Sequence, residues 1–449
     1  MRISPLNREI LRLAVPNILS NLSIPLLGMV DTALMGRMES ELYIGAVALG
    51  SIIFNFIYWG FGFLRMGTTG LTAQAYGGEE WNESADILGR AMLVALAGGV
   101  ALILLQGAAA WVGFGLIQGG PEVKSLARQY FLIRIYAAPA TLGLYVLHGW
   151  FLGMQNARYP LILTVFVNGA NVFLNIFFVF NLGMKSDGVA LGTVCAQYLG
   201  VAAAVLLFLK KYKPFLLRID RKRILDFKTM KSFMAVNLNI FIRTMGLIFA
   251  FAFFVSQSAA EGALMLAANQ ILLQYLNLMS YGVDGFAFAA ESLVGRFVGE
   301  GQPAMLRSSV KKLFLWGCSL GCLFSAAYLF FGGGFLRIFT NQQAIIEAAR
   351  PYLWWMVLLP PAGSIAYMWD GVYIGATATR TLRNMMILSL SAGYLAVFYL
   401  VRGTLGNHGL WLAIFCFMVV RGLTLGISAG REIFNRTEPD REKISKNQE

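Results

Sequence analysis

The chain of 449 residues alternates long apolar runs with short polar breaks. An α-helix rises 1.5 Å per residue, so about 20 apolar residues cross the ~30 Å hydrocarbon layer of a bilayer. Twelve runs are about this long or longer, which predicts an all-α integral membrane protein with twelve transmembrane helices. The runs are Ile10–Leu34, Leu42–Tyr76, Leu88–Leu116, Tyr130–Gly153, Pro160–Leu182, Gly188–Leu209, Phe233–Val255, Ala263–Val298, Leu313–Leu336, Tyr352–Ile374, Met385–Leu400 and His408–Ala429.

The two halves of the chain repeat one another at a constant shift of 222 residues. The matched pairs include Arg128 and Arg350, Pro139 and Pro361, Gly149 and Gly371, Gly153 and Gly375, and Arg158 and Arg380. Each half holds an even number of spans, so both halves enter the membrane in the same direction, as parallel repeats do. We therefore predict two pseudo-symmetric six-helix bundles.

The domain boundaries follow from this repeat and from one long basic break. We predict an N-terminal lobe at 1–209 (helices 1–6), a basic cytoplasmic linker at 210–232, a C-terminal lobe at 233–430 (helices 7–12) and a cytoplasmic tail at 431–449. The linker contains nine Lys or Arg residues. It is open to two interpretations: attraction to anionic lipid headgroups, or a disordered connection.

Composition agrees with a membrane protein, since 57% of the residues are hydrophobic and only 13% are charged. A soluble domain has roughly a quarter of its residues charged. The net charge of +13 would suit a nucleic acid partner, but the basic residues lie in short loops between apolar runs. Such loops encode topology, and the positive-inside rule puts both termini and the linker in the cytoplasm. No nucleic acid partner is expected.

Charged residues inside the spans are the candidate functional groups. They are Asp31, Asp284, Glu291, Asp370, Arg65, Arg134, Arg243 and Arg421. Each would cost ~2.5–3.5 kcal/mol at the centre of a lone helix, so pairing is expected. We predict that the three C-terminal acids face inward and that Arg243 or Arg421 neutralises at least one of them. Structural ion pairing and a role in transport both remain open for each residue.

Polar residues also form stripes along single helix faces. The fifth span carries Thr164, Asn168, Asn171 and Asn175 at steps of four and three. Such stripes either hold helices together or line a polar cavity, and their presence in both halves favours the cavity. Metal or enzyme chemistry is not expected: Cys318 and Cys322 lack further ligands, and no HExxH motif occurs.

Four stretches resemble the multidrug and toxic compound extrusion (MATE) family, most closely its DNA-damage-inducible protein F subfamily. They are LAVPNILSNLSIPLLGMVDTALMGR, RMGTTGLTAQAYGG, YGVDGFAFAAESLVG and WDGVYIGATATRTLRN. The resemblance implies a monomeric, cofactor-free efflux pump of the bacterial cytoplasmic membrane. It would exchange protons for amphipathic, mainly cationic drugs by alternating access among membrane lipids, and so contribute to antibiotic resistance. Sodium-coupled export and flipping of a lipid-linked substrate remain alternatives.

The resemblance also assigns roles to single residues. The N-lobe acid of the family matches Asp31, its bending proline Pro16, its fifth-helix Asn-x-x-x-Asp pattern Asn171 and Asn175, and its sixth-helix threonine Thr193. The second acid is therefore an amide here. The tenth-helix aspartate matches Asp370, whereas the seventh span offers Arg243 and no carboxylate, which weakens the sodium interpretation.

We predict that Asp31 carries the coupling proton, with Asn171, Asn175 and Thr193 around it, and that Asp284, Glu291, Asp370 and Arg243 line a cationic-substrate cavity in the C-lobe. Burial disfavours a charged carboxylate, so an acid in this setting takes up a proton readily. Pro16 and Pro25 each remove a backbone hydrogen bond from the first helix, which lets it bend at modest cost.

Overall fold

A computed structural model describes residues 4–36 and 40–435. Within these two ranges the chain is almost entirely helical and contains no strand, so the predicted all-α fold class is confirmed. Ten segments are long and apolar enough to cross a membrane, counted over the described residues. Two more long helices, α12 (Ala263–Gly299) and α15 (Leu353–Gly375), match the remaining two predicted spans.

More than half of the residues of these two helices are buried. The helix α12 carries Asn269, Gln270, Gln274, Asn277 and Asp284, and α15 carries two prolines and Asp370. Polar residues in a membrane helix favour contact with other helices rather than with lipid. The two helices accordingly pack against each other.

The described chain divides into two compact units. The N-terminal unit comprises residues 22–36, 40–72 and 80–237, and the C-terminal unit comprises residues 4–21, 73–79 and 238–435. The first helix, α1 (Pro5–Met35), and α3 (Phe63–Gly77) each contribute residues to both units. The predicted lobe boundaries at 209, 232 and 430 stay a prediction.

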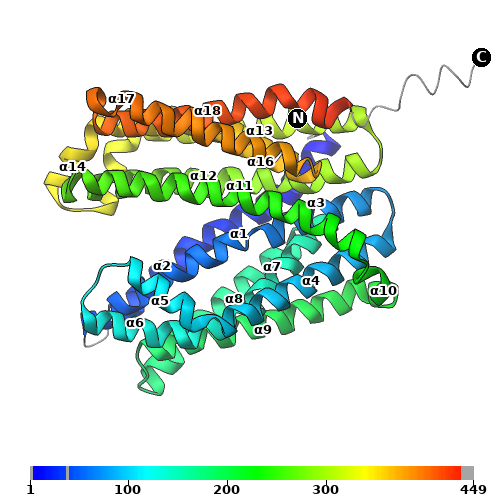
Figure 1. The fold of residues 1–449 in the computed structure, drawn as a ribbon, viewed down its shortest axis with the longest axis horizontal. Coiled ribbons are helices and arrows are strands. Elements are labelled where there is room, and N and C mark those ends of the chain that lie inside the picture. Colours follow the sequence, from blue (N-terminus) through cyan, green and yellow to red (C-terminus); the bar gives the residue numbers. More distant parts are fainter. Residues whose placement is uncertain (1–3, 37–39, 436–449) are drawn as a thin grey trace, which may run out of the picture. The chain divides into compact units, whose positions relative to one another are not determined.

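The N-terminal unit is a set of long helices in which α4 packs on α7 and α8 packs on α9 (Figure 1). Besides its parts of α1 and α3, this unit contains α2 (Glu41–Gly60), α4 (Trp81–Leu104), α5 (Gln106–Leu116), α6 (Pro121–Arg134), η1 (Ile135–Ala137), α7 (Ala138–Gly153), α8 (Arg158–Ile176), η2 (Phe177–Asn181), α9 (Ser186–Tyr212), η3 (Lys213–Arg218) and α10 (Arg221–Ile224).

The C-terminal unit is built around α12 and α15, with α13 and α18 packed on α15. Besides α12 and α15, this unit contains α13 (Pro303–Phe339), α14 (Gln343–Ala349), η4 (Arg350–Tyr352), α16 (Thr379–Leu388), η5 (Ser389–Ala396), α17 (Val397–Leu405), α18 (Asn407–Ala429) and η6 (Gly430–Phe434). Most of α11 (Phe227–Ala260) also belongs to it.

The helix boundaries reproduce the predicted repeat. At the same shift of 222 residues, the starts of α2 and α12, the starts of α4 and α13, the ends of α3 and α12, and the ends of α7 and α15 coincide. One difference separates the two halves: α2 and α3 are interrupted at Phe61 and Gly62, whereas α12 runs through the equivalent positions. The repeat is therefore a property of the structure as well as of the sequence.

Matched glycines mark close backbone contacts inside each unit. A Cβ atom on Gly149 would overlap the carbonyl oxygen of Arg65, and one on the equivalent Gly371 would overlap the carbonyl oxygen of Ala287. Arg65 and Ala287 are themselves 222 residues apart. Each unit thus brings the same pair of helices into backbone contact, which only a residue without a side chain permits.

We expect Gly371→Ala to destabilise the protein, because a methyl group would push α15 away from α12. Overpacking of this kind costs about 1–3 kcal/mol. The matched control is Gly333→Ala, in the same unit, where a Cβ would meet nothing within 4 Å. Thermal unfolding in detergent micelles should show a lower midpoint for Gly371→Ala alone. Equal midpoints for the two variants would contradict the assigned contact.

Candidate functional site

Three of the residues predicted to surround the coupling proton form one hydrogen-bonded chain between α8 and α9. The amide nitrogen Nδ2 of Asn175 donates to Oδ1 of Asn171 at 3.1 Å, and Nδ2 of Asn171 donates to Oγ1 of Thr193 at 3.1 Å. The Thr193 hydroxyl in turn donates to the carbonyl oxygen of Val189 at 3.0 Å. Both asparagines are buried. The structure therefore brings these predicted residues together.

Close packing holds this chain in place. A Cβ atom on Gly192 of α9 would overlap the amide oxygen of Asn175, so the α9 backbone lies directly against the amide. A buried amide that is fixed in this way can donate with its nitrogen and accept with its oxygen, and neither group titrates. The chain therefore provides a polar lining whose charge does not change with pH.

A cavity of about 520 Å³ lies beside these residues, between the second half of α1 and α8. Its lining includes Ser23 and Val30 from α1 and Asn168 and Ile176 from α8. Nδ2 of Asn168 donates to Oγ of Ser23 at 3.0 Å, which ties the two helices together at one end of the cavity. The two helices run in the same direction if successive spans cross the membrane alternately, because they belong to the first and the fifth span.

This arrangement places the backbone of Asp31 at the depth of the amide chain. At 1.5 Å per residue, Asp31 lies about 12 Å along α1 from Ser23, and Asn175 lies about 10.5 Å along α8 from Asn168. The side chain of Asp31 is outside the part of the chain that the structure describes, although its backbone belongs to α1. Its contacts with Asn171 and Asn175 stay a prediction.

The two prolines of the first helix lie in an unbroken helix. Both Pro16 and Pro25 belong to α1, which runs from Pro5 to Met35. The Ser20 hydroxyl donates to the carbonyl oxygen of Pro16 at 2.9 Å, and Nδ2 of Asn17 donates to that of Leu13 at 2.9 Å. A proline ring removes one donor from the helix, so α1 contains two positions where bending breaks fewer bonds. Bending itself stays a prediction.

In the C-terminal unit, Asp370 of α15 is bound by two arginines. Arg243 of α11 and Arg421 of α18 both direct a terminal guanidinium nitrogen at the same carboxylate oxygen. All three side chains are buried. Removing charges from water costs several kcal/mol per ion, and the mutual attraction of the three groups offsets that cost. The expected pairing is thus present with both arginines rather than with one.

The other two predicted acids lie on α12 beside this triad. Glu291 is buried and Asp284 is half-buried. Both act electrostatically on Arg243, and Asp284 also acts on Arg421. The cluster therefore contains three acids and two arginines, and its formal charge is −1 when all are ionised. A net negative, largely buried cluster favours a cation over an anion.

One contact in the N-terminal unit was not predictable from the sequence. Arg134 of α6 donates to the hydroxyl oxygen of Tyr130 at 2.6 Å and to that of Ser51 at 3.1 Å, and its guanidinium lies 4.8 Å from the centre of the Phe54 ring. Cation–π contacts of this kind stabilise a desolvated arginine. Arg134 is one of the charged residues predicted inside the spans, and nothing in the sequence indicated its partners.

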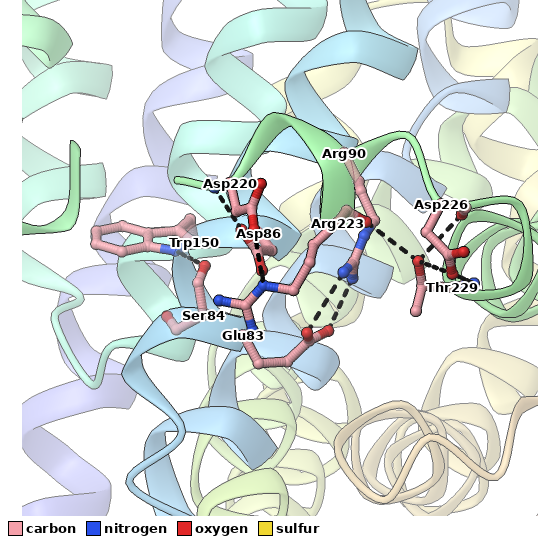
Figure 2. Close-up of polar contacts among 9 residues, drawn as sticks. All are labelled: Glu83, Ser84, Asp86, Arg90, Trp150, Asp220, Arg223, Asp226 and Thr229. Atoms are coloured by element: carbon pink, nitrogen blue, oxygen red, sulfur yellow. Dashed lines mark hydrogen bonds and ion pairs between the residues drawn. The ribbon is translucent and has the colours of Figure 1, made fainter. Parts of the chain in front are cut away.

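A second missed cluster holds the basic segment 210–232 against α4 (Figure 2). Oδ1 of the fully buried Asp86 accepts the backbone N–H of Asp220 at 3.1 Å, and its Oδ2 lies 3.3 Å from Nε of Arg223. Arg90 pairs with Glu83 at 2.7 Å. The feature of the sequence that could have indicated this cluster is Asp86, an acid near the start of an apolar run.

The basic segment 210–232 is helical in η3, α10 and the start of α11, so its interpretation as a disordered connection was wrong.

The same segment caps α11. Thr229 donates its backbone N–H at 2.9 Å and its hydroxyl at 3.0 Å to the carboxylate of Asp226. These hydrogen bonds favour the ionised form and hold the pKa of Asp226 below its ordinary value. The start of α11 is therefore fixed by a local cap.

Comparison with known proteins places this architecture among transporters. A profile of the family MatE matches residues 16–177 and 238–399. The chain is 35% identical to DNA damage-inducible protein F of Escherichia coli (strain K12) over 93% of this chain and 91% of that protein. It is 26% identical to a probable multidrug resistance protein NorM of Bradyrhizobium diazoefficiens over 90% of this chain and 89% of the other. A crystal structure of MATE in the bent conformation shares the fold with a TM-score of 0.84 and 19% identity, over 97% and 96% of the two chains.

Proposed function

This chain belongs to the multidrug and toxic compound extrusion family, and we propose that it exports amphipathic, mainly cationic compounds in exchange for protons. It is a multi-pass membrane transporter of the multidrug efflux type and not an enzyme. The proposal extends to alternating access, to a monomer, and to a bacterial cytoplasmic membrane with both termini inside.

The observation that supports proton coupling is the neutral amide chain of Asn175, Asn171 and Thr193, which belongs to the same unit as Asp31. Amide and hydroxyl groups can both donate and accept hydrogen bonds, so they can pair with a carboxylate as well as with a carboxylic acid and accommodate either protonation state of one acid. A second fixed carboxylate, by contrast, would supply the charge that a sodium ion needs. The position that carries an acid in the family's fifth-helix pattern is Asn175 here.

The C-terminal acids give further support. Sodium ions are bound by several oxygen ligands, and carboxylates contribute the strongest of them. Asp370 already binds Arg243 and Arg421 through one carboxylate oxygen. A cation could reach that oxygen only by displacing a guanidinium group, and breaking a buried pair costs about 3–5 kcal/mol. Protons are therefore the favoured coupling ion.

Purified protein in liposomes should export a fluorescent lipophilic cation when a pH gradient is imposed. One pH unit supplies about 1.4 kcal/mol per proton, enough for a tenfold substrate gradient in one-for-one neutral exchange. A sodium gradient at equal pH should drive no flux above protein-free vesicles. Collapse of the pH gradient with a protonophore serves as the control. Flux driven by sodium alone would contradict the proposal, and flipping of a lipid-linked phosphate with no dye export would favour the flippase alternative.

A further inference from the structure

A second cavity, of about 900 Å³, lies in the N-terminal unit, away from Asn171 and its neighbours. Its walls come from α4, α7 and α9, and its end is closed by the basic segment between α9 and α11. The size falls within the ~300–1,000 Å³ that is typical of small-molecule sites. The lining is almost entirely apolar, and several of its leucines, such as Leu93, Leu96 and Leu225, are exposed. Exposed leucines on the outside of a membrane helix contact lipid.

One charged side chain lines this cavity. Arg221, the first residue of α10, is exposed and belongs to the lining. No acidic side chain is among the described residues that line the cavity, and none of the ion pairs between described residues involves Arg221. The cavity therefore combines an apolar interior with a single guanidinium group at the linker end.

Contacts around Asp86 hold the residues on both sides of Arg221, and Figure 2 shows those of Asp220 and Arg223. Asp86 accepts the backbone N–H of Asp220, and Asp220 caps α10 by accepting the backbone N–H of Lys222 at 2.9 Å. Arg223 pairs with Asp86 and with Asp220. The side chain of Ile224 packs against Gly89 of α4, where a Cβ atom would overlap it. Residues on both sides of Arg221 are thus bound to α4, and the start of α10 is held beside the cavity that Arg221 lines.

We propose that this cavity binds an anionic phospholipid, with an acyl chain between α4, α7 and α9 and the phosphate on Arg221. The end of the cavity at the basic segment lies where the apolar spans end and basic residues begin. Lipid headgroups of the adjoining leaflet therefore lie at the same depth as Arg221. The charge complementarity selects an anionic headgroup, since Arg forms bidentate hydrogen bonds with phosphate oxygens. A cationic transport substrate is disfavoured by the same arginine. The site is separate from the transport site and independent of the coupling ion.

Three variants of the full-length protein test the site. Arg221→Gln removes the guanidinium group. Lys222→Gln removes the neighbouring positive charge, which belongs to the same short helix but not to the cavity lining. Gly143→Leu fills the cavity from α7, where a Cβ atom would meet only the Met92 sulfur at 3.7 Å, so the added side chain has room. A leucine also favours the helix more than glycine does, which protects folding.

Binding is measured by native mass spectrometry in detergent with dioleoyl phosphatidylglycerol, and with dioleoyl phosphatidylcholine as the neutral-headgroup comparison. Wild-type protein should retain one phosphatidylglycerol more tightly than phosphatidylcholine. Arg221→Gln should weaken phosphatidylglycerol binding about fivefold, the effect of one basic residue at a membrane surface. Lys222→Gln should bind as wild type does, and Gly143→Leu should lose the tightly bound lipid of either kind.

Other outcomes overturn the proposal. Equal loss in Arg221→Gln and Lys222→Gln would mean a diffuse surface attraction rather than a site. Unchanged binding in Gly143→Leu would place the lipid elsewhere. Equal affinity for the two lipids, or displacement of phosphatidylglycerol by soluble glycerol phosphate alone, would show that the apolar cavity and the arginine do not act together.

Discussion

Replacing Asp31 by Asn should abolish proton-driven export while leaving the protein folded. The substitution keeps the size and the hydrogen-bonding capacity of the side chain but removes the group that exchanges a proton. Asp31 is the acid of the predicted N-terminal spans that matches the family's coupling acid. Export in liposomes under an imposed pH gradient should fall to the level of protein-free vesicles. Unfolding in detergent should be unchanged or slightly shifted upward, because a neutral amide is cheaper to bury than a carboxylate.

The control for this variant is Asp31→Glu, which keeps the acid and moves it by one methylene group. It should retain proton-dependent export at a reduced rate, since the proton remains available but its position relative to Asn171 and Asn175 changes. Normal export by Asp31→Asn with an unchanged pH profile would refute the assignment. That result would transfer the coupling role to the C-terminal acids Asp284, Glu291 and Asp370.

The spans and the repeat could be predicted from the sequence because both are one-dimensional patterns. A hydrophobic run long enough to cross a bilayer is typical of a membrane span. Its backbone forms a helix because lipid offers no hydrogen-bond partners to the peptide groups. The shared positions of Gly149 and Gly371 could be read in the same way, since close helix approach demands glycine at both. Even the grouping of Asn171 with Asn175 follows from helical spacing alone.

Contacts between residues far apart in the chain could not be predicted. Asp86 and Asp220 are separated by 134 residues, and nothing in their local sequence links them. For the same reason, the sequence indicated that Arg243 or Arg421 would pair with an acid. It did not indicate that both arginines would pair with Asp370. The interruption of α2 and α3 at Phe61 and Gly62 was hidden within one continuous apolar run.

The second large effect is expected at the buried triad. Asp370→Asn would leave Arg243 and Arg421 facing each other without the carboxylate that neutralises them. Removing one partner of a buried pair costs about 3–5 kcal/mol, because the remaining charges stay desolvated. The variant should therefore unfold at a markedly lower temperature in detergent and accumulate poorly in membranes. Any export that remains should be measured per folded molecule, so that instability and loss of function are distinguished.

A double variant separates charge from packing. Asp370→Asn combined with Arg421→Gln removes one acid and one base, so the cluster keeps its formal charge and Arg243 is no longer opposed by a second arginine. If electrostatic repulsion is the main cost, the double variant should be more stable than Asp370→Asn alone, and the two substitutions should be strongly non-additive. Thermal unfolding of the two single variants and the double variant measures this coupling. Additive losses would show that the three side chains contribute by packing alone, and the role of Asp370 as the neutralising centre of the C-terminal unit would then be wrong.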